Sequence, residues 1–281
     1  MKKTFQIGNF CFSLSYPNEI VPPPNFMLFE KPDGKAEYSY TINIAEFLPA
    51  IDGQVIAKRP DIEIYSSNGF ESRLIGIKGK DSYYAYYSET SDVSAEITLS
   101  VNEISGLHID PVFTSLLVLE RRLIRSNALI LHCAYIKYNG RAILFSAPSE
   151  TGKTTQANLW KKHRNSETVN GDRALLQRID NNWFARGWPV CGTSEDCCNE
   201  DTPIRAIVML SQGTEDNLSI LSPITAFSQL YSQITVNTWN KDFVQRNTDL
   251  IAELVQQVPV YHLSCTISEN AVKCLESALY N

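Results

Sequence analysis

One segment of the chain has the residue types and the spacing needed to bind a triphosphate. Residues 147–154 read APSETGKT, in which Gly152, Lys153 and Thr154 follow one another. In a P-loop, a glycine-containing turn directs backbone N–H groups at the phosphates, the lysine reaches the β- and γ-phosphates, and the next hydroxyl binds Mg²⁺. Ala147 stands where such loops usually begin with glycine, which is acceptable if Ala147 keeps a negative φ angle. The segment predicts a nucleoside triphosphate site.

The sequence around this segment supports the same interpretation. Average residue usage gives a chance of roughly 2% that such a match arises at random in a chain of this length. The segment also follows an apolar strand at 142–145 and opens a helix expected at 153–162, whose positive end favours anions. The residues expected to bind the nucleotide, ATP, are Ser149, Glu150, Thr151, Gly152, Lys153, Thr154 and Thr155.

Two features near the loop bear on magnesium binding and catalysis. Asp172, in the NGDR sequence at 170–173, is the candidate carboxylate that binds Mg²⁺ together with Thr154 or accepts the proton of an attacking hydroxyl. A plain turn is an equally good interpretation, because Gly-Asp often marks one. Glu150 places a negative charge beside the phosphates, which weakens binding unless Lys153, Arg173 or Mg²⁺ offsets it.

The first part of the chain is expected to be mostly β. Runs such as 38–44 and 96–101 alternate apolar and polar residues between Gly, Pro, Asp and Asn. A helix is then expected over 110–123, with Asp110 as N-cap and Pro111 in its first position. We therefore expect a β-rich N-terminal domain at 1–108 and a second domain at 109–281.

The second part alternates strands and helices, as in an α/β domain. Asn139-Gly140 predicts a hairpin between strands at 128–136 and 141–146. The remaining elements are expected in the following order: helix 153–162, hairpin 174–179 with 183–186, strand 204–210, helices 225–233 and 242–257, strand 258–265 and a helix from 268. The hairpin is informative, because a doubly wound nucleotide fold would follow its acidic strand with a helix.

The composition argues against several classes of partner and predicts a cytoplasmic protein. A formal net charge of −6 argues against binding to nucleic acid or to anionic lipid. No segment approaches the roughly 20 apolar residues that span a bilayer. Seven scattered cysteines, none at Cys-x-x-Cys spacing, are typical of reduced thiols in a cytosol. The sequence leaves open whether the chain forms homo-oligomers.

Three short motifs together resemble a known kinase family. Leu131-His132-Cys133, the APSETGKT loop and the NGDR sequence resemble the catalytic domain of HPr kinase/phosphorylase, and more closely the HPr-kinase-like proteins encoded beside modified-peptide (RiPP) pathways, including the lasso-peptide kinases. The resemblance covers residues 125–215. It implies a phosphoenolpyruvate-carboxykinase-like P-loop domain in which ATP phosphorylates a serine hydroxyl.

The same resemblance implies roles for single residues. By position, Lys153 would bind phosphate, Thr154 would bind Mg²⁺, Asp172 would be metal ligand or base, and His132 would lie near the γ-phosphate. The expected catalytic residues are therefore Asp172, His132 and Lys153. HPr kinase/phosphorylase has two adjacent aspartates where this chain has Gly171-Asp172, so one carboxylate has no match. Loop acids at Glu195 and Asp196 are an alternative source of a second carboxylate.

These observations lead to one expected function and one alternative. We expect an ATP- and Mg²⁺-dependent kinase that transfers the γ-phosphoryl group to a serine hydroxyl of a peptide, a protein or a small molecule. Phosphorylase activity is not expected, because the C-terminal signature of the bifunctional enzyme has no match. The alternative is a non-catalytic, nucleotide-dependent module whose β-rich half captures a peptide. Arg186 and Arg205 could clamp phosphate or simply form ion pairs.

Overall fold

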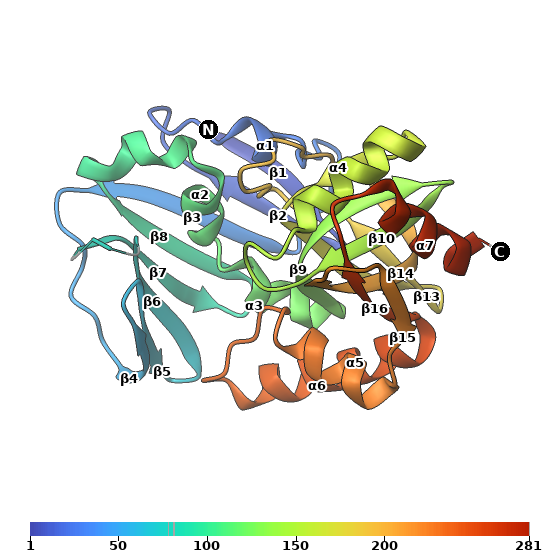
Figure 1. The fold of residues 1–281 in the computed structure, drawn as a ribbon. Helices are drawn as coiled ribbons and strands as arrows, with labels where there is room; N and C mark the ends of the chain where they lie inside the picture. The colour runs from blue at the N-terminus through green and yellow to red at the C-terminus, as the bar shows by residue number, and fades with distance from the viewer. Residues whose placement is uncertain (78, 81, 281) are drawn as a thin grey trace. The chain divides into compact units, whose positions relative to one another are not determined.

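A computed structural model describes residues 1–77, 79–80 and 82–280 of the chain. By its internal contacts the chain forms two compact units, Met1–Arg122 and Leu123–Asn281. Figure 1 shows the strands and helices of both units, coloured along the chain. The division comes after residue 122, whereas the sequence suggested a boundary after residue 108.

The first unit is built on one eight-stranded sheet with the order β1-β2-β3-β8-β7-β6-β5-β4. Its strands are β1 (Lys2–Ile7), β2 (Phe10–Ser15), β3 (Tyr38–Ala45), β4 (Gln54–Arg59), β5 (Ile62–Ser67), β6 (Phe70–Gly76), β7 (Tyr83–Ser91) and β8 (Ser94–Ser100). β3 is parallel to β2 and β8, and the other pairs are antiparallel. Tyr38, Tyr40 and Ile42 alternate with less buried residues along β3, as a strand with one buried face requires. The mostly β character expected for this part is confirmed.

The helical segment of this unit differs from the expected single helix. The short helices are α1 (Pro24–Met27), η1 (Val101–His108), α2 (Asp110–Ser115) and α3 (Leu119–Leu123). The expectation of one helix over 110–123 was wrong, because Val118 has a φ of 49° and interrupts the backbone between α2 and α3. Asp110 is not the N-cap, which is Ile109; its Oδ2 instead accepts a hydrogen bond from Asn25 Nδ2 at 2.7 Å.

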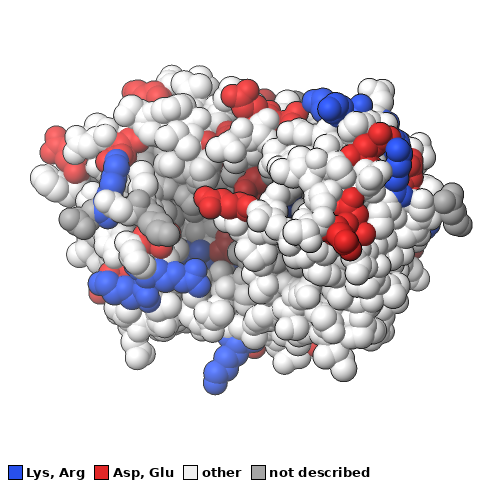
Figure 2. Space-filling model, viewed as in Figure 1, with Lys and Arg blue, Asp and Glu red and all other residues white. Residues whose placement is uncertain are grey.

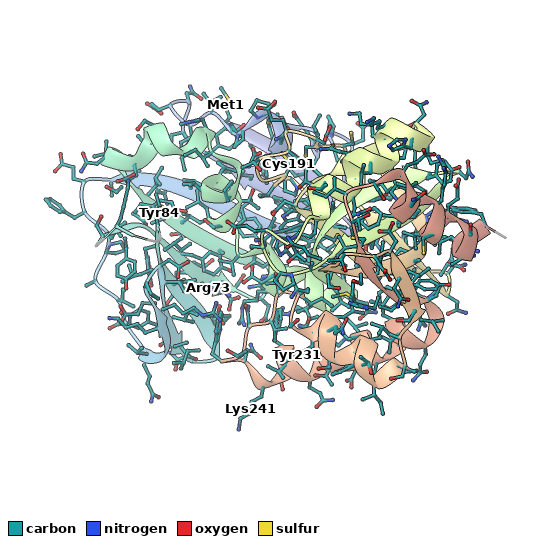
Figure 3. All side chains as sticks on the ribbon, viewed as in Figure 1. Met1, Arg73, Tyr84, Cys191, Tyr231 and Lys241 are labelled. Carbon is teal, nitrogen blue, oxygen red and sulfur yellow. The ribbon has the colours of Figure 1, made fainter. Side chains whose placement is uncertain are left out.

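Buried ion pairs attach α3 to the sheet of the first unit. Arg73, on β6, donates from Nη1 to Glu120 Oε1 at 2.7 Å, and Arg121 Nη2 donates to Glu89 Oε2 at 2.9 Å. Arg122 also pairs with Glu89. Figure 3 labels Arg73 on this sheet. Since a buried charge is costly without its partner, these contacts give a physical reason for residues up to 122 to belong to the first unit.

The second unit is a mixed α/β structure in which part of the sheet closes into a ring. Its strands are β9 (Ala128–Tyr138), β10 (Arg141–Ser146), β11 (Glu167–Asn170), β12 (Arg173–Ile179), β13 (Asn182–Arg186), β14 (Asp201–Gln212), β15 (Asn217–Ile220) and β16 (Val260–Cys265). The order is β10-β9-β12-β13-β14-β16-β15, and β10 also pairs with β14. β9 and β14 are long enough for one half of each to pair with the hairpin β12–β13 and the other half with β10.

Helices cover both faces of this sheet in the second unit. They are η2 (Ile124–Ser126), α4 (Lys153–Arg164), α5 (Pro223–Tyr231), α6 (Lys241–Gln257) and α7 (Glu269–Tyr280). Alternate residues of β9 enter two separate cores: Leu131 packs in one with residues of α5 and α6, and Ile136 in the other with residues of α4 and α7. Figure 1 shows these two helix pairs on opposite sides of the strands. The elements expected in this part of the chain are confirmed, and β11 and β15 are additional.

Charged side chains do not form one large patch on the face of the molecule drawn in Figure 2. On the face drawn in Figure 2, Asp and Glu side chains and Lys and Arg side chains gather in small separate groups. The longest helix, α6, is amphipathic and rich in charged and polar residues. Within the described ranges, no helix combines the length and the apolar character that crossing a bilayer demands.

Candidate functional site

The 147–154 loop connects β10 to α4 and has a backbone suited to anions. Glu150 has a φ of 66° and Gly152 a φ of 115°, so left-handed residues recur within the turn. Such alternation points successive N–H groups into one concavity, which is an anion-binding arrangement. Gly152 is also the N-cap of α4, and the N-terminus of this helix adds a favourable dipole. Ala147 is buried and is not among the described residues with positive φ.

Lys153 is buried beneath this loop. Its side chain is directed at the loop carbonyls, and Nζ donates to Ala147 O at 3.0 Å and to Pro148 O at 3.2 Å. Burial lowers the pKa of Lys153, and the negative charge of Asp172 raises it in part. Thr151 Oγ1 donates to Pro148 O at 2.9 Å, and Thr154 is exposed in the first turn of α4. The loop therefore encloses Lys153, and the exposed hydroxyl of Thr154 can face a ligand.

His132 and Asp172 lie next to the start of this loop. β9 pairs with both β10 and β12, so His132 sits between the two strands: its carbonyl accepts from Ser146 Oγ at 2.8 Å, and its Cα is opposite Arg173. His132 Nε2 is 3.6 Å from Asp172 Oδ1, which is too far for a hydrogen bond. Burial, and next the positive charge of Lys153, lower the pKa of His132 and outweigh the opposite effect of Asp172. The three residues expected to be catalytic are thus neighbours, and burial disfavours the charged form of the imidazole.

Asn170 fixes the turn that presents Asp172, and the sequence analysis did not identify it. Its side chain is fully buried, and Oδ1 accepts from the backbone N–H groups of Asp172 and Arg173, each at 2.9 Å. Its Nδ2 donates to Trp188 O at 2.9 Å and to Val190 O at 3.1 Å. Asparagine before Gly-Asp is a known Asx-turn signal, so part of this role was readable from the sequence.

Gly171 explains why a second carboxylate has no place in this turn. A Cβ atom added to Gly171 would lie 2.0 Å from Ser194 Oγ, so the side chain of Ser194 fills that space. Ser194 Oγ donates to Cys191 O at 2.8 Å, which holds the loop in position. Gly192 of the same loop lies against the Asp172 side chain, where an added Cβ would be 3.2 Å from Asp172 Cβ. Among the described contacts, none joins Glu195 or Asp196 to Asp172.

Three arginines considered from the sequence have different surroundings. Arg173 Nε donates to Asp172 Oδ2 at 3.1 Å, and its side chain is 41% exposed, so it is available at the site. Arg186 pairs with Asp201 at 2.7 Å. Arg205 bonds to the Leu279 carbonyl and lies over the Tyr280 ring. For Arg186 and Arg205 the ion-pair or structural alternative is therefore the better interpretation.

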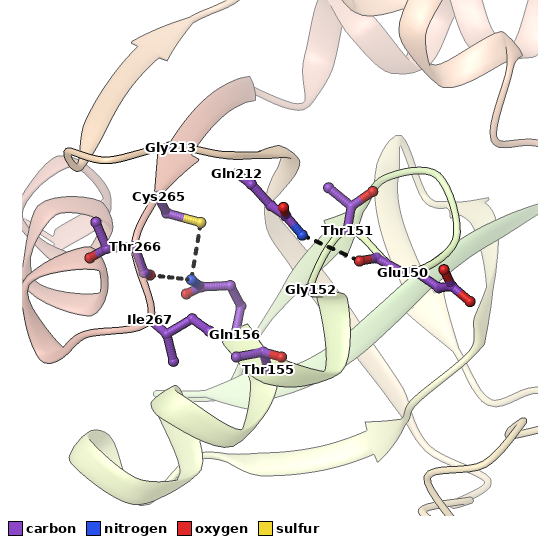
Figure 4. A pocket seen from close by; sticks show the side chains of 10 residues that line it. All are labelled: Glu150, Thr151, Gly152, Thr155, Gln156, Gln212, Gly213, Cys265, Thr266 and Ile267. Atoms are coloured by element: carbon purple, nitrogen blue, oxygen red, sulfur yellow. Dashed lines mark hydrogen bonds between the residues drawn. The ribbon is translucent and has the colours of Figure 1, made fainter.

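A cavity of about 390 Å³ adjoins the other side of the 147–154 loop. Figure 4 shows the side chains that line it, which are Glu150, Thr151, Gly152, Thr155, Gln156, Gln212, Gly213, Cys265, Thr266 and Ile267. Four of the residues expected to bind nucleotide are among them. Figure 4 also shows the Glu150 carboxylate directed away from Gln156, while the Glu150 carbonyl accepts from Gln212 Nε2 at 3.4 Å. The cavity was not expected from the sequence, because Gln212, Cys265 and Thr266 belong to no motif.

The donor groups at the site bear on which metal it could hold. Over the described residues, no three His, Cys, Asp or Glu side chains gather into a group that could hold a metal by themselves. Mg²⁺ commonly uses one or two protein oxygens and completes its shell with phosphates and water. Thr154 and Asp172 are oxygen donors of this kind: Thr154 directly follows Lys153 in the chain, and Asp172 lies near enough for its charge to act on the pKa of Lys153.

Comparisons with known proteins show which family the chain belongs to. The solved structure of the HPr(Ser) kinase/phosphatase from Coxiella burnetii matches with 10% sequence identity and a TM-score of 0.32, over 53% of this chain and 86% of that chain. A likeness this low supports no argument about the fold or the function. Comparison with curated proteins gives no match. The family model described as SynChlorMet cassette protein ScmC matches residues 102–280, well over half of the chain, and the chain therefore belongs to the ScmC family.

Proposed function

We propose that this protein is an ATP- and Mg²⁺-dependent kinase that transfers the γ-phosphoryl group to a serine hydroxyl. The observation that carries the proposal is the meeting of Lys153, His132 and Asp172 at the start of a loop with an anion-binding backbone. A turn whose only role was to cap α4 would not need a buried lysine beside a histidine and a carboxylate. The resemblance of the three motifs to HPr-kinase-like proteins supports the same reaction.

Each residue has a stated role in the proposed reaction, and Asp172 has two, as metal ligand and as base. The N–H groups of the 147–154 loop and Lys153 bind the phosphates, and Thr154 and Asp172 would hold Mg²⁺. The metal, when bound, neutralises charge on the phosphate oxygens. The acceptor oxygen forms a bond to the γ-phosphorus while the bond to the β,γ-bridging oxygen breaks and ADP leaves. The hydroxyl proton passes to Asp172, and His132 donates a hydrogen bond to a γ-phosphate oxygen.

The acceptor and the compartment are part of the proposal. A serine of a peptide is the acceptor that the sequence resemblance favours, with a protein or a small-molecule hydroxyl as the broader class. All seven cysteines are free thiols, which suits the reducing cytoplasm where ATP is available. We propose kinase activity without phosphorylase activity.

The test is phosphoryl transfer from γ-labelled ATP. Purified protein is incubated with Mg²⁺, labelled ATP and the serine-containing peptides encoded beside its gene. We expect label in a peptide, loss of ATP binding in Lys153→Ala, and loss of transfer by about 100-fold or more with retained ATP binding in Asp172→Asn. Normal ATP binding without transfer to any peptide would argue against a kinase.

One observation favours a second candidate function. Ser194 occupies the space that a side chain at Gly171 would need, so the turn offers one carboxylate where kinases of the resembling family have two. A non-catalytic module, in which ATP sets the conformation and the first unit captures a peptide, needs no base. The two functions differ in Asp172→Asn: this variant keeps the biological output of the module and abolishes that of the kinase.

A further inference from the structure

The strands of the second unit direct several loops to the cavity beside the 147–154 loop. β10, β14 and β16 run parallel to one another, so their carboxyl ends lie at the same edge of the sheet. The 147–154 loop follows β10, Gly213 follows β14, and Thr266 follows β16. Ligand sites in α/β folds commonly lie outside the carboxyl ends of the parallel strands. The cavity of about 390 Å³ lies at this edge and is within the size range of small-molecule sites.

The position of this cavity indicates which end of a bound nucleotide it would hold. Its lining includes Thr151 and Gly152 but neither His132 nor Asp172. A nucleotide whose phosphates lie on the loop would therefore point its γ-phosphate to His132 and Asp172 and its other end to the cavity. That other end is the ribose and the base.

Gln156 supplies a polar group with an unmet hydrogen bond in this cavity. The residue is 2% exposed, and its Nε2 donates to Cys265 Sγ at 3.1 Å and to Thr266 O at 3.4 Å. Its Oε1 is buried and has no hydrogen-bond partner among the described residues. Turning the amide over would bring Oε1 against Thr266 O, and both atoms only accept. The carbonyl of Gln156 is therefore an acceptor without a donor among the described residues.

The cavity also has an apolar surface for a planar ring. Ile267 lies next to Gln156 in Figure 4 and is 81% exposed, although it is a large apolar side chain. A base placed between Ile267 and the 147–154 loop would cover this side chain and remove it from water.

We propose that the cavity binds the base of the nucleotide and that Gln156 Oε1 accepts a hydrogen bond from the exocyclic amino group of adenine. The inference rests on the proposed nucleotide binding and adds its base preference. The proposed contact includes a rotation of the Gln156 side chain toward the cavity, which exchanges the Nε2 hydrogen bonds to Cys265 Sγ and Thr266 O for the one to adenine. Hypoxanthine presents a carbonyl at the same position, so two acceptors would face each other and the hydrogen bond would be lost.

The experiment compares three Mg²⁺-bound ligands on the full chain by calorimetry: ATP, ITP and inorganic tripolyphosphate. We expect ATP to bind about tenfold or more tightly than ITP, because a site built for a donor discriminates against an analogue without it. In Gln156→Leu the ATP affinity should fall to the level of ITP. Gln245→Leu is the matched control, since Gln245 is exposed on α6 and bonds only to Asp249 in the described contacts.

A second variant keeps the test informative if Gln156→Leu is unstable. Ile267→Ala changes an exposed side chain, and it should weaken ATP and ITP by about threefold while leaving tripolyphosphate unchanged. Equal affinities for ATP, ITP and tripolyphosphate in the unmodified protein would overturn the base site and leave phosphate binding intact. Failure of all three ligands to bind would instead overturn the proposed nucleotide binding together with the base site.

Discussion

Asn170 shows how one buried amide can organise a site. Its Oδ1 and Nδ2 make four hydrogen bonds to backbone groups, two on the turn of Asp172 and two on the segment at 188–190. The side chain therefore joins two parts of the chain that are distant in sequence. It acts on Asp172 only through the backbone, so it is a positioning residue.

The first prediction at this scale concerns stability. Asn170→Ala should lower the free energy of unfolding by about 2–4 kcal/mol, because it leaves several buried backbone groups without partners. Denaturation in urea measures the change. Asn158→Ala, on the exposed surface of α4, is the control and should change stability by less than about 0.5 kcal/mol. Equal effects of the two substitutions would contradict the assigned role of Asn170.

The second prediction at this scale concerns pH. Burial lowers the folded-state pKa of His132 below its usual value of about 6.5, so the unfolded chain binds a proton that the folded chain does not. Stability should therefore fall as the pH drops through this unfolded value toward the lower folded pKa. In His132→Gln that part of the pH dependence should disappear.

Urea denaturation at pH values from 8 to 5, in steps of about half a unit, checks this sign. His108→Gln is the control, since His108 is exposed in η1. A His132→Gln profile that parallels the unmodified protein below pH 6.5 would show that burial of the imidazole does not affect its titration.

At the scale of elements, the loop at 191–198 packs against the turn between β11 and β12. The contact depends on the absence of a side chain at Gly171, since Ser194 fills that volume. Cys198 N donates to Val169 O at 2.9 Å and extends the same contact. The loop thereby covers one side of Asp172.

A pair of substitutions tests this packing. Gly171→Ala should destabilise the protein by about 1–3 kcal/mol, because the new methyl group overlaps Ser194. Adding Ser194→Gly should recover at least about 1 kcal/mol of that loss, a coupling measurable by denaturation of both single variants and the double variant. Additive effects would mean that Ser194 does not occupy the space beside Gly171.

At the scale of the whole molecule, every residue of the candidate site belongs to the second unit, Leu123–Asn281. The second unit has its own pair of hydrophobic cores, and the first unit has its own sheet. A ligand that binds the folded second unit stabilises that unit by mass action.

Hydrogen exchange of the full chain should therefore report binding locally. Saturating Mg²⁺-ATP, at about 100 times its dissociation constant, should stabilise the second unit by about 2.7 kcal/mol. The slowest exchanging amides of β9, β10 and β14 should gain this protection, and those of β3 and β8 should change little. Equal protection of both units would show that the units unfold together.

Much of the second unit was predictable from local patterns. Asn139-Gly140 correctly predicted the hairpin β9–β10, and the apolar run at 204–210 correctly predicted a buried strand. The helix at 110–123 was the clear failure. Its residues have helical periodicity, but Val118 adopts a positive φ, and α3 is held instead by ion pairs to β6 and β7.

The sequence by itself determined the 147–154 loop, because the geometry of a phosphate-binding turn depends on a few adjacent residue types. It also determined most element types, since periodicity and turn residues act over short distances. Only the tertiary structure decided which distant residues meet: His132 with Asp172, Gly171 with Ser194, and Gln156 with Cys265. These contacts depend on strand order and on packing between side chains that are far apart in the sequence. A local sequence pattern encodes neither.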